Sequence, residues 1–404
     1  MTDSSETFRP AVIIPAYSRP GALRRLLASI NRAHYSDQRV HLIISMDGGA
    51  DAKVVDFARA FEFAGGTVEV IERTERLGLR KHILWCGDQA EKYGSVIVLE
   101  DDLMVDPWFY HYASHALAAY GNEHTIAGVA LYAPRYNDYA HLPFEPLQNG
   151  RSAYLMQVPC SWGQAWTADQ WRNFRAWYAK SEDDVVDRDG TVPDEVSSWP
   201  ASSWKKYFAS YLSATGRYFV YPYRSYTTNC ADPGGTHLPR GADLHQVRLG
   251  DPWREFKVPD FPTLAEHRVV YDVFMEPRVQ VDFAALSIPP GSVAVDFYAI
   301  KPVSLLRDSD YCLTTRNVKA ALATFPLTFR PLEMNIYAQA DLATDGPVRF
   351  CRSDQLYDRE PLLGRLRAKY RLKWYFQPGP TSGLSLIMFG IASLLRRLRN
   401  LLPW

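Results

Sequence analysis

Three consecutive carboxylates, Glu100, Asp101 and Asp102, follow a run of apolar, mostly β-branched residues at 95–99. Like charges crowded at the tip of a buried strand repel one another, and a bound divalent cation would relieve that repulsion. Oxygen ligands suit Mg²⁺ or Mn²⁺, and a metal held by one or two carboxylates keeps positions open for phosphate oxygens. The same residues could instead form a solvated turn and cap a following helix, because acids favour helix starts. The triplet therefore predicts a metal and phosphate site or, alternatively, a capped turn.

The segments that precede the triplet alternate between short apolar runs and amphipathic stretches. The apolar runs predict strands at 11–17, 40–46, 67–72 and 95–99, and the stretches between them predict helices. Continuous apolar strands separated by helices indicate a parallel sheet that is covered on both faces. In such a sheet the ligand lies beyond the carboxyl ends of the strands, which is where Tyr17, Asp47 and the acidic triplet fall.

Three motifs in this region, AVIIPAYSRP (11–20), ISMDGG (44–49) and VLEDDLMVDPWFY (98–110), together resemble those of a known enzyme family. They are similar to inverting nucleotide-sugar glycosyltransferases of the GT-A fold, family 2 and its relatives, which include N-acetylglucosaminyltransferase I and bacterial polysaccharide enzymes. The resemblance covers about residues 10–240. It implies a Rossmann-like, mostly parallel α/β sheet with helices on both faces. It also implies a nucleoside-diphosphate sugar donor, most often a UDP-sugar, with Mn²⁺ or Mg²⁺ as cofactor.

The resemblance also assigns expected roles to individual residues of the donor site. Around the nucleotide it places Pro15, Tyr17, Arg19 and Asp47, and near the diphosphate it places Arg76, Arg80, Lys81 and Asp101, although the basic residues could equally be a solvated loop. Asp102 would bind the metal directly, with Glu100 and His237 as further ligands; His237 could also be a structural or surface histidine. Trp162 and Gly163 resemble the family segment that closes over the donor sugar.

Inversion needs a general base that takes the proton of the acceptor hydroxyl, and a carboxylate usually fills this role. In N-acetylglucosaminyltransferase I the base belongs to an acidic pair that follows a Trp, whereas Lys205 and Lys206 follow Trp204 here. An ammonium group at its ordinary pKa cannot accept the proton. The sequence instead favours Asp194 or Glu195, unless residues 180–195 are only a solvated acidic loop. The remaining alternatives are Asp183, Asp184 and Asp232.

The charge of the chain is balanced in total but not along its length. Residues 361–404 carry eight Lys and Arg and no Asp or Glu, which leaves residues 1–360 with 37 basic and 45 acidic side chains. Leucine, isoleucine and methionine recur at helical spacing from Leu384 to Leu402, with Arg396, Arg397 and Arg399 among them. The apolar stretch is too short to span a bilayer, so the pattern predicts a helix lying on an anionic membrane surface or, alternatively, docked on the protein or a partner subunit.

The composition of the chain indicates its structural class and its cellular compartment. With 47% hydrophobic and 13% aromatic residues the chain is expected to be globular, and its five scattered cysteines indicate neither a disulfide framework nor a zinc site. The N-terminus does not resemble a secretory signal, so we expect a cytoplasmic protein, peripheral on the inner face of the membrane. No nucleic-acid partner is expected.

The pattern divides the chain into a catalytic domain at 1–240, a mixed or β-rich extension at 241–345 and a basic amphipathic tail at 346–404. Within the extension, strands or extended segments are predicted at 269–275, 279–286, 292–300 and 329–337. The extension could recognise an acceptor, form a homo-oligomer or support the fold. We expect a glycosyltransferase acting on a glycan or lipid-linked acceptor in surface polysaccharide synthesis; the alternatives are a non-catalytic carbohydrate-binding relative and a sugar nucleotidyltransferase.

Overall fold

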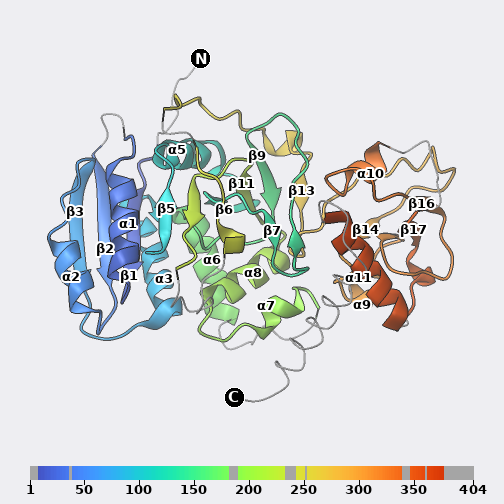
Figure 1. The fold of residues 1–404 in the computed structure, drawn as a ribbon, viewed down its shortest axis with the longest axis horizontal. Coiled ribbons are helices and arrows are strands. Elements are labelled where there is room, and N and C mark those ends of the chain that lie inside the picture. Colours follow the sequence, from blue (N-terminus) through green and yellow to red (C-terminus); the bar gives the residue numbers. More distant parts are fainter. Residues whose placement is uncertain are drawn as a thin grey trace.

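The computed structural model describes residues 8–35, 39–181, 190–232, 243–250, 253–338, 346–359 and 362–376. Figure 1 shows a large α/β unit, coloured from blue to yellow, beside a smaller unit coloured orange and red. Two predicted features, His237 and the C-terminal amphipathic helix, lie outside the described residues. Within the described residues, no helix is long and apolar enough to cross a membrane.

A nine-stranded sheet forms the centre of the large unit. Its strands, from one edge to the other, are β13 (Val270–Tyr271), β9 (Ala153–Met156), β11 (Tyr218–Pro222), β6 (Ile126–Ala130), β10 (Gln164–Thr167), β4 (Ser95–Val98), β1 (Ala11–Ala16), β2 (Val40–Met46) and β3 (Gly66–Glu72). The four strands β4, β1, β2 and β3 are parallel neighbours, as the sequence predicts. Strand β10 lies antiparallel between β4 and β6, with Gln164 opposite both Val98 and Ala130.

Helices cover both faces of this sheet because the strands are apolar on both sides. Val12 and Ile14 of β1 face one core, whereas Ala11 and Ile13 face the other, as the period of two along a strand requires. The first core is closed by α1 (Pro20–Asn31), α2 (Ala52–Arg59) and α5 (Phe109–Tyr120). The second is closed by α3 (Gly78–Asp88), α4 (Ala90–Tyr93), α6 (Ala168–Ser181) and α8 (Trp204–Thr215). The predicted α/β fold with helices on both faces is thus confirmed.

The smaller unit has its own sheet and its own core. Its strands run in the order β14 (Val293–Asp296), β15 (Tyr311–Thr314), β17 (Val348–Arg352) and β16 (Ala323–Phe325). The short helices α9 (Val303–Leu306) and α10 (Met334–Tyr337) and the longer α11 (Leu362–Phe376) accompany this sheet. Leu372 and Phe376 of α11 belong to the same core as Leu313, Val348 and Phe350 of the strands.

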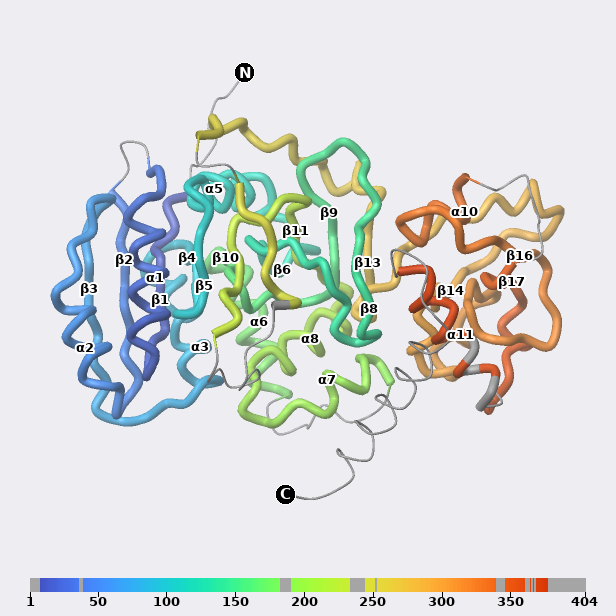
Figure 2. The backbone as a smooth tube through the Cα atoms, viewed as in Figure 1, coloured from blue at the N-terminus to red at the C-terminus, as the bar shows by residue number. Residues whose placement is uncertain are grey.

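The two sheets divide the chain at places other than the predicted boundaries. Strand β13 extends the large sheet although it follows residue 240, and Figure 2 shows the chain passing from β13 into the smaller unit. Strand β17 follows residue 345 yet pairs with β15 and β16. The strand expected at 329–337 is replaced by helix α10, because the Asn335 side chain binds the backbone of Thr328 and Phe329 and fixes a turn there. Whether the three predicted ranges fold independently stays a prediction.

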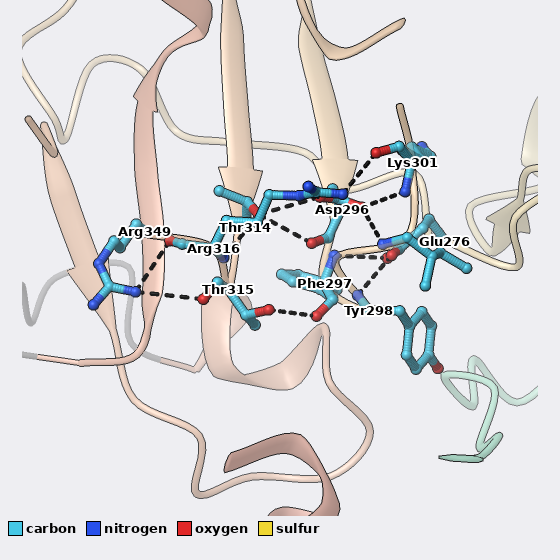
Figure 3. A network of polar contacts seen from close by, with 10 residues as sticks. Glu276, Asp296, Phe297, Tyr298, Lys301, Thr314, Thr315, Arg316 and Arg349 are labelled. Atoms are coloured by element: carbon cyan, nitrogen blue, oxygen red, sulfur yellow. Dashed lines mark hydrogen bonds and ion pairs between the residues drawn. The ribbon is translucent and has the colours of Figure 1, made fainter. Parts of the chain in front are cut away.

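Buried charges join the two units (Figure 3). Glu276, which follows β13, accepts hydrogen bonds from the backbone N–H groups of Phe297 (2.9 Å) and Tyr298 (2.7 Å), beyond β14. Asp296 accepts from the backbone of residues 300 and 301 and pairs with Arg316 at 2.6 Å. Lys301 in turn pairs with Asp272. Burial raises the pKa of Glu276 well above its usual range, and this network holds the carboxyl where the units meet.

Candidate active site

The acidic triplet follows directly after β4, at the carboxyl end of the parallel strands. The next segment, β5 (Leu103–Val105), pairs with β12 (Thr227–Asn229) in a separate ribbon. The backbone N–H of Cys230 donates to the carbonyl of Asp102 at 3.0 Å. The chain near residue 230 is therefore held beside the triplet, although more than a hundred residues separate them.

Arg19, at the start of α1, binds two of the three carboxylates. Its guanidinium pairs with Asp101 and with Oδ2 of Asp102, the latter at 2.9 Å. Burial alone would lower the pKa of Arg19, but the two carboxylates outweigh it and raise that pKa. The sequence places Arg19 at the nucleotide base; in the structure its side chain lies on the acids that would hold the metal.

One buried carboxylate oxygen of the triplet has no hydrogen-bond partner among the described residues. This oxygen is Oδ1 of Asp102. Burial raises the pKa of Glu100 to about 8 and that of Asp101 to about 6, and the neighbouring carboxylates add to both effects. An unpaired buried oxygen and repelling carboxylates fit a divalent cation. The described residues contain no group of three His, Cys, Asp or Glu side chains placed to hold a metal. Phosphate oxygens of a donor are ligands that would suit the remaining coordination positions.

Asp47 organises the loop that leads into α3. Its Oδ1 accepts from the backbone N–H of Leu77 at 2.7 Å, and its Oδ2 from that of Gly78 at 3.0 Å. These bonds lower the pKa of Asp47 although burial acts in the opposite direction. Behind the loop, His82 is hydrogen-bonded to Ser45 at 2.8 Å, and burial lowers its pKa to about 4. The predicted contact of Asp47 with base or ribose stays a prediction; its carboxylate oxygens already accept hydrogen bonds from the loop before α3.

Two of the predicted nucleotide residues meet across the carboxyl ends of β1 and β3. The Arg76 guanidinium lies over the Tyr17 ring, 4.6 Å from its centroid, and Pro15 is half-buried nearby in β1. Arg80 points elsewhere, because it donates to the Tyr207 hydroxyl of α8 at 2.8 Å. The Lys81 side chain is exposed. The structure thus brings Tyr17 and Arg76 together and directs Arg80 toward α8.

Trp162 and Gly163 lie just before β10, which runs antiparallel to β4. Because Gln164 is opposite Val98, the two preceding residues lie beside the start of the acidic triplet. Gly163 has a φ of +94°, and a Cβ there would lie 2.7 Å from Cγ2 of Thr227. Thr227 also donates to the Trp162 carbonyl at 2.5 Å. Glycine is therefore required where this loop passes β12.

A polar cluster that the sequence reasoning missed surrounds Trp162. His245 packs on the Trp162 ring at 4.4 Å between centroids and lies 3.7 Å from Oδ1 of Asp138. The Lys205 ammonium lies over the same indole at 5.6 Å, and its charge favours ionisation of Glu100. The Asp138 carboxylate is 40% exposed. Asp138, His245 and Lys205 thus form a group on the side of Trp162, near the acidic triplet.

The predicted general bases lie in a different setting. Asp194 and Glu195 are in the first turn of α7 (Asp194–Ser198), and both side chains are exposed. Asp232, a further alternative, forms an ion pair with Arg25 of α1. Asp183 and Asp184 lie outside the described residues. A sequence signal for Asp138 and His245 is hard to name, because they are far apart in the chain and belong to no motif.

The sequence of this site matches one family model. Residues 11–157 match the model described as "Glycosyl transferase family 2". This match confirms the resemblance to nucleotide-sugar glycosyltransferases and contains the strands from β1 to β9 with the acidic triplet. The particular resemblance to N-acetylglucosaminyltransferase I stays a prediction. No curated protein matches the chain.

Solved structures resemble the chain only distantly. S. aureus TarS (residues 1–349) is 13% identical over 55% of this chain and 60% of its own, with a TM-score of 0.34. The mannosyltransferase PcManGT from Pyrobaculum calidifontis, in complex with GDP-Man and Mn²⁺, is 13% identical over 59% and 61%, with a TM-score of 0.37. GalNAc-T7 with UDP, GalNAc and Mn²⁺ is 14% identical over 54% and 43%, with a TM-score of 0.37. The chain thus spans about 60% of the length of the first two.

Proposed function

We propose, from the family 2 match over residues 11–157, that this protein is a glycosyltransferase that uses a nucleoside-diphosphate sugar. A UDP-sugar is the donor and a saccharide or lipid-linked glycan is the acceptor. The observation that carries the proposal is the meeting of Arg19, Asp101 and Asp102 at the carboxyl end of the sheet, inside the matched segment. The Tyr17 and Arg76 side chains, which follow β1 and β3, offer an aromatic face and a cation to the nucleotide.

A divalent cation, Mn²⁺ or Mg²⁺, would be held by Asp102 through its unpaired Oδ1, with Glu100 close by. When bound, the cation would neutralise negative charge on the departing diphosphate. Arg19 already binds the other oxygen of Asp102, so it orients the carboxylate and leaves Oδ1 free. Asp101 is 5% exposed and is held by the same guanidinium, which suits it to orient Arg19 rather than to contact the donor.

Transfer with inversion forms a bond from the acceptor oxygen to the anomeric carbon while the bond from that carbon to phosphate breaks. The acceptor proton must pass to a base as this happens. Asp194 and Glu195 remain candidates from the sequence. Asp138 is a further candidate, because it is partly exposed and lies near His245, which packs on Trp162 beside the acidic triplet. The His245 ring lies 3.7 Å from Oδ1 of Asp138 and would attract that carboxylate when protonated.

Variants distinguish these bases. If Asp138 accepts the proton, Asp138→Asn lowers kcat about 100-fold or more and leaves the KM for the donor nearly unchanged. Asp194→Asn and Glu195→Gln serve as matched controls, since each replaces a carboxylate of similar size. A large loss of kcat in either control, with full activity of Asp138→Asn, would return the role to α7.

One assay tests the proposed function against its two alternatives. Purified protein is incubated with UDP-sugars and Mn²⁺, with and without saccharide acceptors and in a parallel reaction with pyrophosphate, and the products are separated by chromatography. Release of UDP supports glycosyl transfer or its hydrolytic side reaction. Formation of UTP from UDP-sugar and pyrophosphate would indicate a nucleotidyltransferase. Saccharide binding with no turnover of any donor would indicate a non-catalytic carbohydrate-binding protein.

A further inference from the structure

Helix α11 has two apolar faces, and among the described residues one of them packs into the core of the smaller unit while the other is exposed. Ala368, Leu372 and Phe376 are four residues apart and are 4%, 1% and 7% exposed. Leu366, Tyr370 and Trp374 are also four residues apart and lie on the opposite side of the helix, with 53%, 36% and 48% exposure. We call these last three the outer stripe. Single exposed hydrophobic residues are ordinary, but three in one row on one helix form a continuous apolar surface.

The charges of α11 have a single sign. The helix contains five Lys and Arg residues and no Asp or Glu. At 100° per residue, Lys369 and Lys373 lie along one side of the outer stripe and Arg371 lies beyond its other side. Trp and Tyr side chains favour the boundary between lipid and water, where their rings are buried and their polar atoms remain wet. An apolar row of this kind with bases on both sides is typical of a helix that lies on a membrane.

Charge also argues against two other occupants of the outer stripe. Residues 377–404, which follow α11 directly, contain three arginines and no acid, so docking them here would bring like charges together. A second copy of α11 would oppose five cations with five more. An anionic lipid surface instead complements both the positive charge of α11 and its apolar row. The same surface would also attract the basic segment that follows α11.

We propose that the outer stripe of α11 binds an anionic bilayer surface, with Leu366, Tyr370 and Trp374 inserted among the headgroups and the flanking bases on lipid phosphates. This surface belongs to the smaller unit, and its binding to lipid does not depend on the proposed sugar transfer. Because neither donor nor acceptor takes part, a failure of the proposed function would leave this inference untouched.

The test is co-sedimentation of the full-length protein with vesicles of phosphatidylcholine alone and of phosphatidylcholine with phosphatidylglycerol. We expect binding to the anionic vesicles that weakens as salt is raised, and much weaker binding to the neutral ones. The variant Leu366→Ser/Tyr370→Ser/Trp374→Ser should bind anionic vesicles about tenfold or more weakly. The variant Lys369→Gln/Arg371→Gln/Lys373→Gln should also bind more weakly and lose much of the salt dependence.

The matched control replaces exposed hydrophobic residues elsewhere in the smaller unit. Leu322→Ser/Phe329→Ser changes side chains that are 47% and 40% exposed, and it should bind vesicles as the unchanged protein does. Arg396→Gln/Arg397→Gln/Arg399→Gln measures the contribution of the C-terminal segment, and binding that still depends on the outer stripe in this background supports the proposal. Unchanged vesicle binding by the triple serine variant would overturn it. The proposal would also be overturned if the triple serine variant shifted from dimer to monomer with unchanged vesicle binding. That result would indicate that the outer stripe is an interface between two copies of the protein.

Discussion

Two groups of three carboxylates in this protein show how burial alone fails to mark a functional site. One group is the triplet Glu100, Asp101 and Asp102, and the other is Asp272, Glu276 and Asp296 between the two units. Both bring like charges close together in largely buried places. The first stands at the open end of a parallel sheet, and the second stands where two sheets are joined. The two groups differ in how their carboxylate oxygens are hydrogen-bonded rather than in how deeply they are buried.

In the group between the units, the carboxylate oxygens are paired. Asp272 accepts from two backbone N–H groups and pairs with Lys301, while both oxygens of Glu276 and of Asp296 accept hydrogen bonds. In the triplet, Asp101 and Asp102 share one guanidinium and Oδ1 of Asp102 has no partner among the described residues. A closed network stabilises a fold, whereas an unpaired buried oxygen is a place for a ligand.

The largest effect that the comparison predicts is on activity. Asp102→Asn should lower sugar transfer about 1,000-fold or more, since it removes a charge worth several kcal/mol to the transition state. Its thermal midpoint should stay close to that of the unchanged protein, because Arg19 keeps its ion pair with Asp101 and the amide oxygen of Asn can still accept from the guanidinium. Steady-state assays and thermal unfolding measure the two quantities. Near-normal transfer by this variant would show that Asp102 does not hold the catalytic metal.

The second effect is on stability: here we expect a loss of folding free energy without a change in donor binding. Asp296→Asn should lower the free energy of unfolding by about 3 kcal/mol, because it removes the buried carboxylate charge that pairs with the Arg316 guanidinium at 2.6 Å. The KM for the donor should not change in the fraction that remains folded. Urea unfolding measures the loss. As control, Asp358→Asn breaks the pair of Asp358, 77% exposed, with Arg307 and should cost about 1 kcal/mol or less.

The smallest effect concerns Glu333, a buried carboxyl that is hydrogen-bonded to the Tyr271 hydroxyl. Burial raises its pKa to about 7 from the ordinary 4.5. Between these values the folded state holds a proton that the unfolded state releases, so stability should fall as pH rises through this window and stay low above it. Glu333→Gln should remove this contribution and stabilise the protein by about 2 kcal/mol at pH 8. Identical pH profiles for the two proteins would argue against the raised pKa.

Sequence alone predicts the part of the site that is local in the chain. The apolar runs of β1, β2 and β4 place Tyr17, Asp47 and Asp102 at one edge, because parallel strands end on the same side. The antiparallel course of β10 is not visible in four buried residues that lack a strand pattern. The proximity of Asp138 to His245 cannot be predicted from the sequence either, since it depends on how distant loops pack around Trp162.

In the smaller unit, too, the sequence predicts local elements but not the contacts between residues that are distant in the chain. The sequence around Asp296 predicts a strand, and β14 is found there, but no motif indicates that its last residue belongs to a buried ionic network. The partners Glu276, Arg316 and Lys301 come from separate turns whose positions follow from tertiary packing. In α11, the spacing of four residues between apolar side chains is visible in the sequence and defines two apolar rows. The structure is needed to show which of these two rows faces the core.

The position of β10 has a consequence for how the chain acquires its shape during synthesis. The first four neighbours, β3, β2, β1 and β4, can assemble as soon as residue 98 has left the ribosome, but the free edge of β4 must wait for Gln164 to Thr167. Until then its backbone N–H and C=O groups can pair with another nascent chain, which is the usual origin of strand-mediated aggregation. The family match ends at residue 157, short of this strand. A fragment cut at that border would keep the acidic triplet but leave one edge of β4 and both edges of β6 permanently open, since β10 and β11 both follow residue 157. The smallest autonomous folding unit therefore reaches beyond the matched segment to β10 and β11.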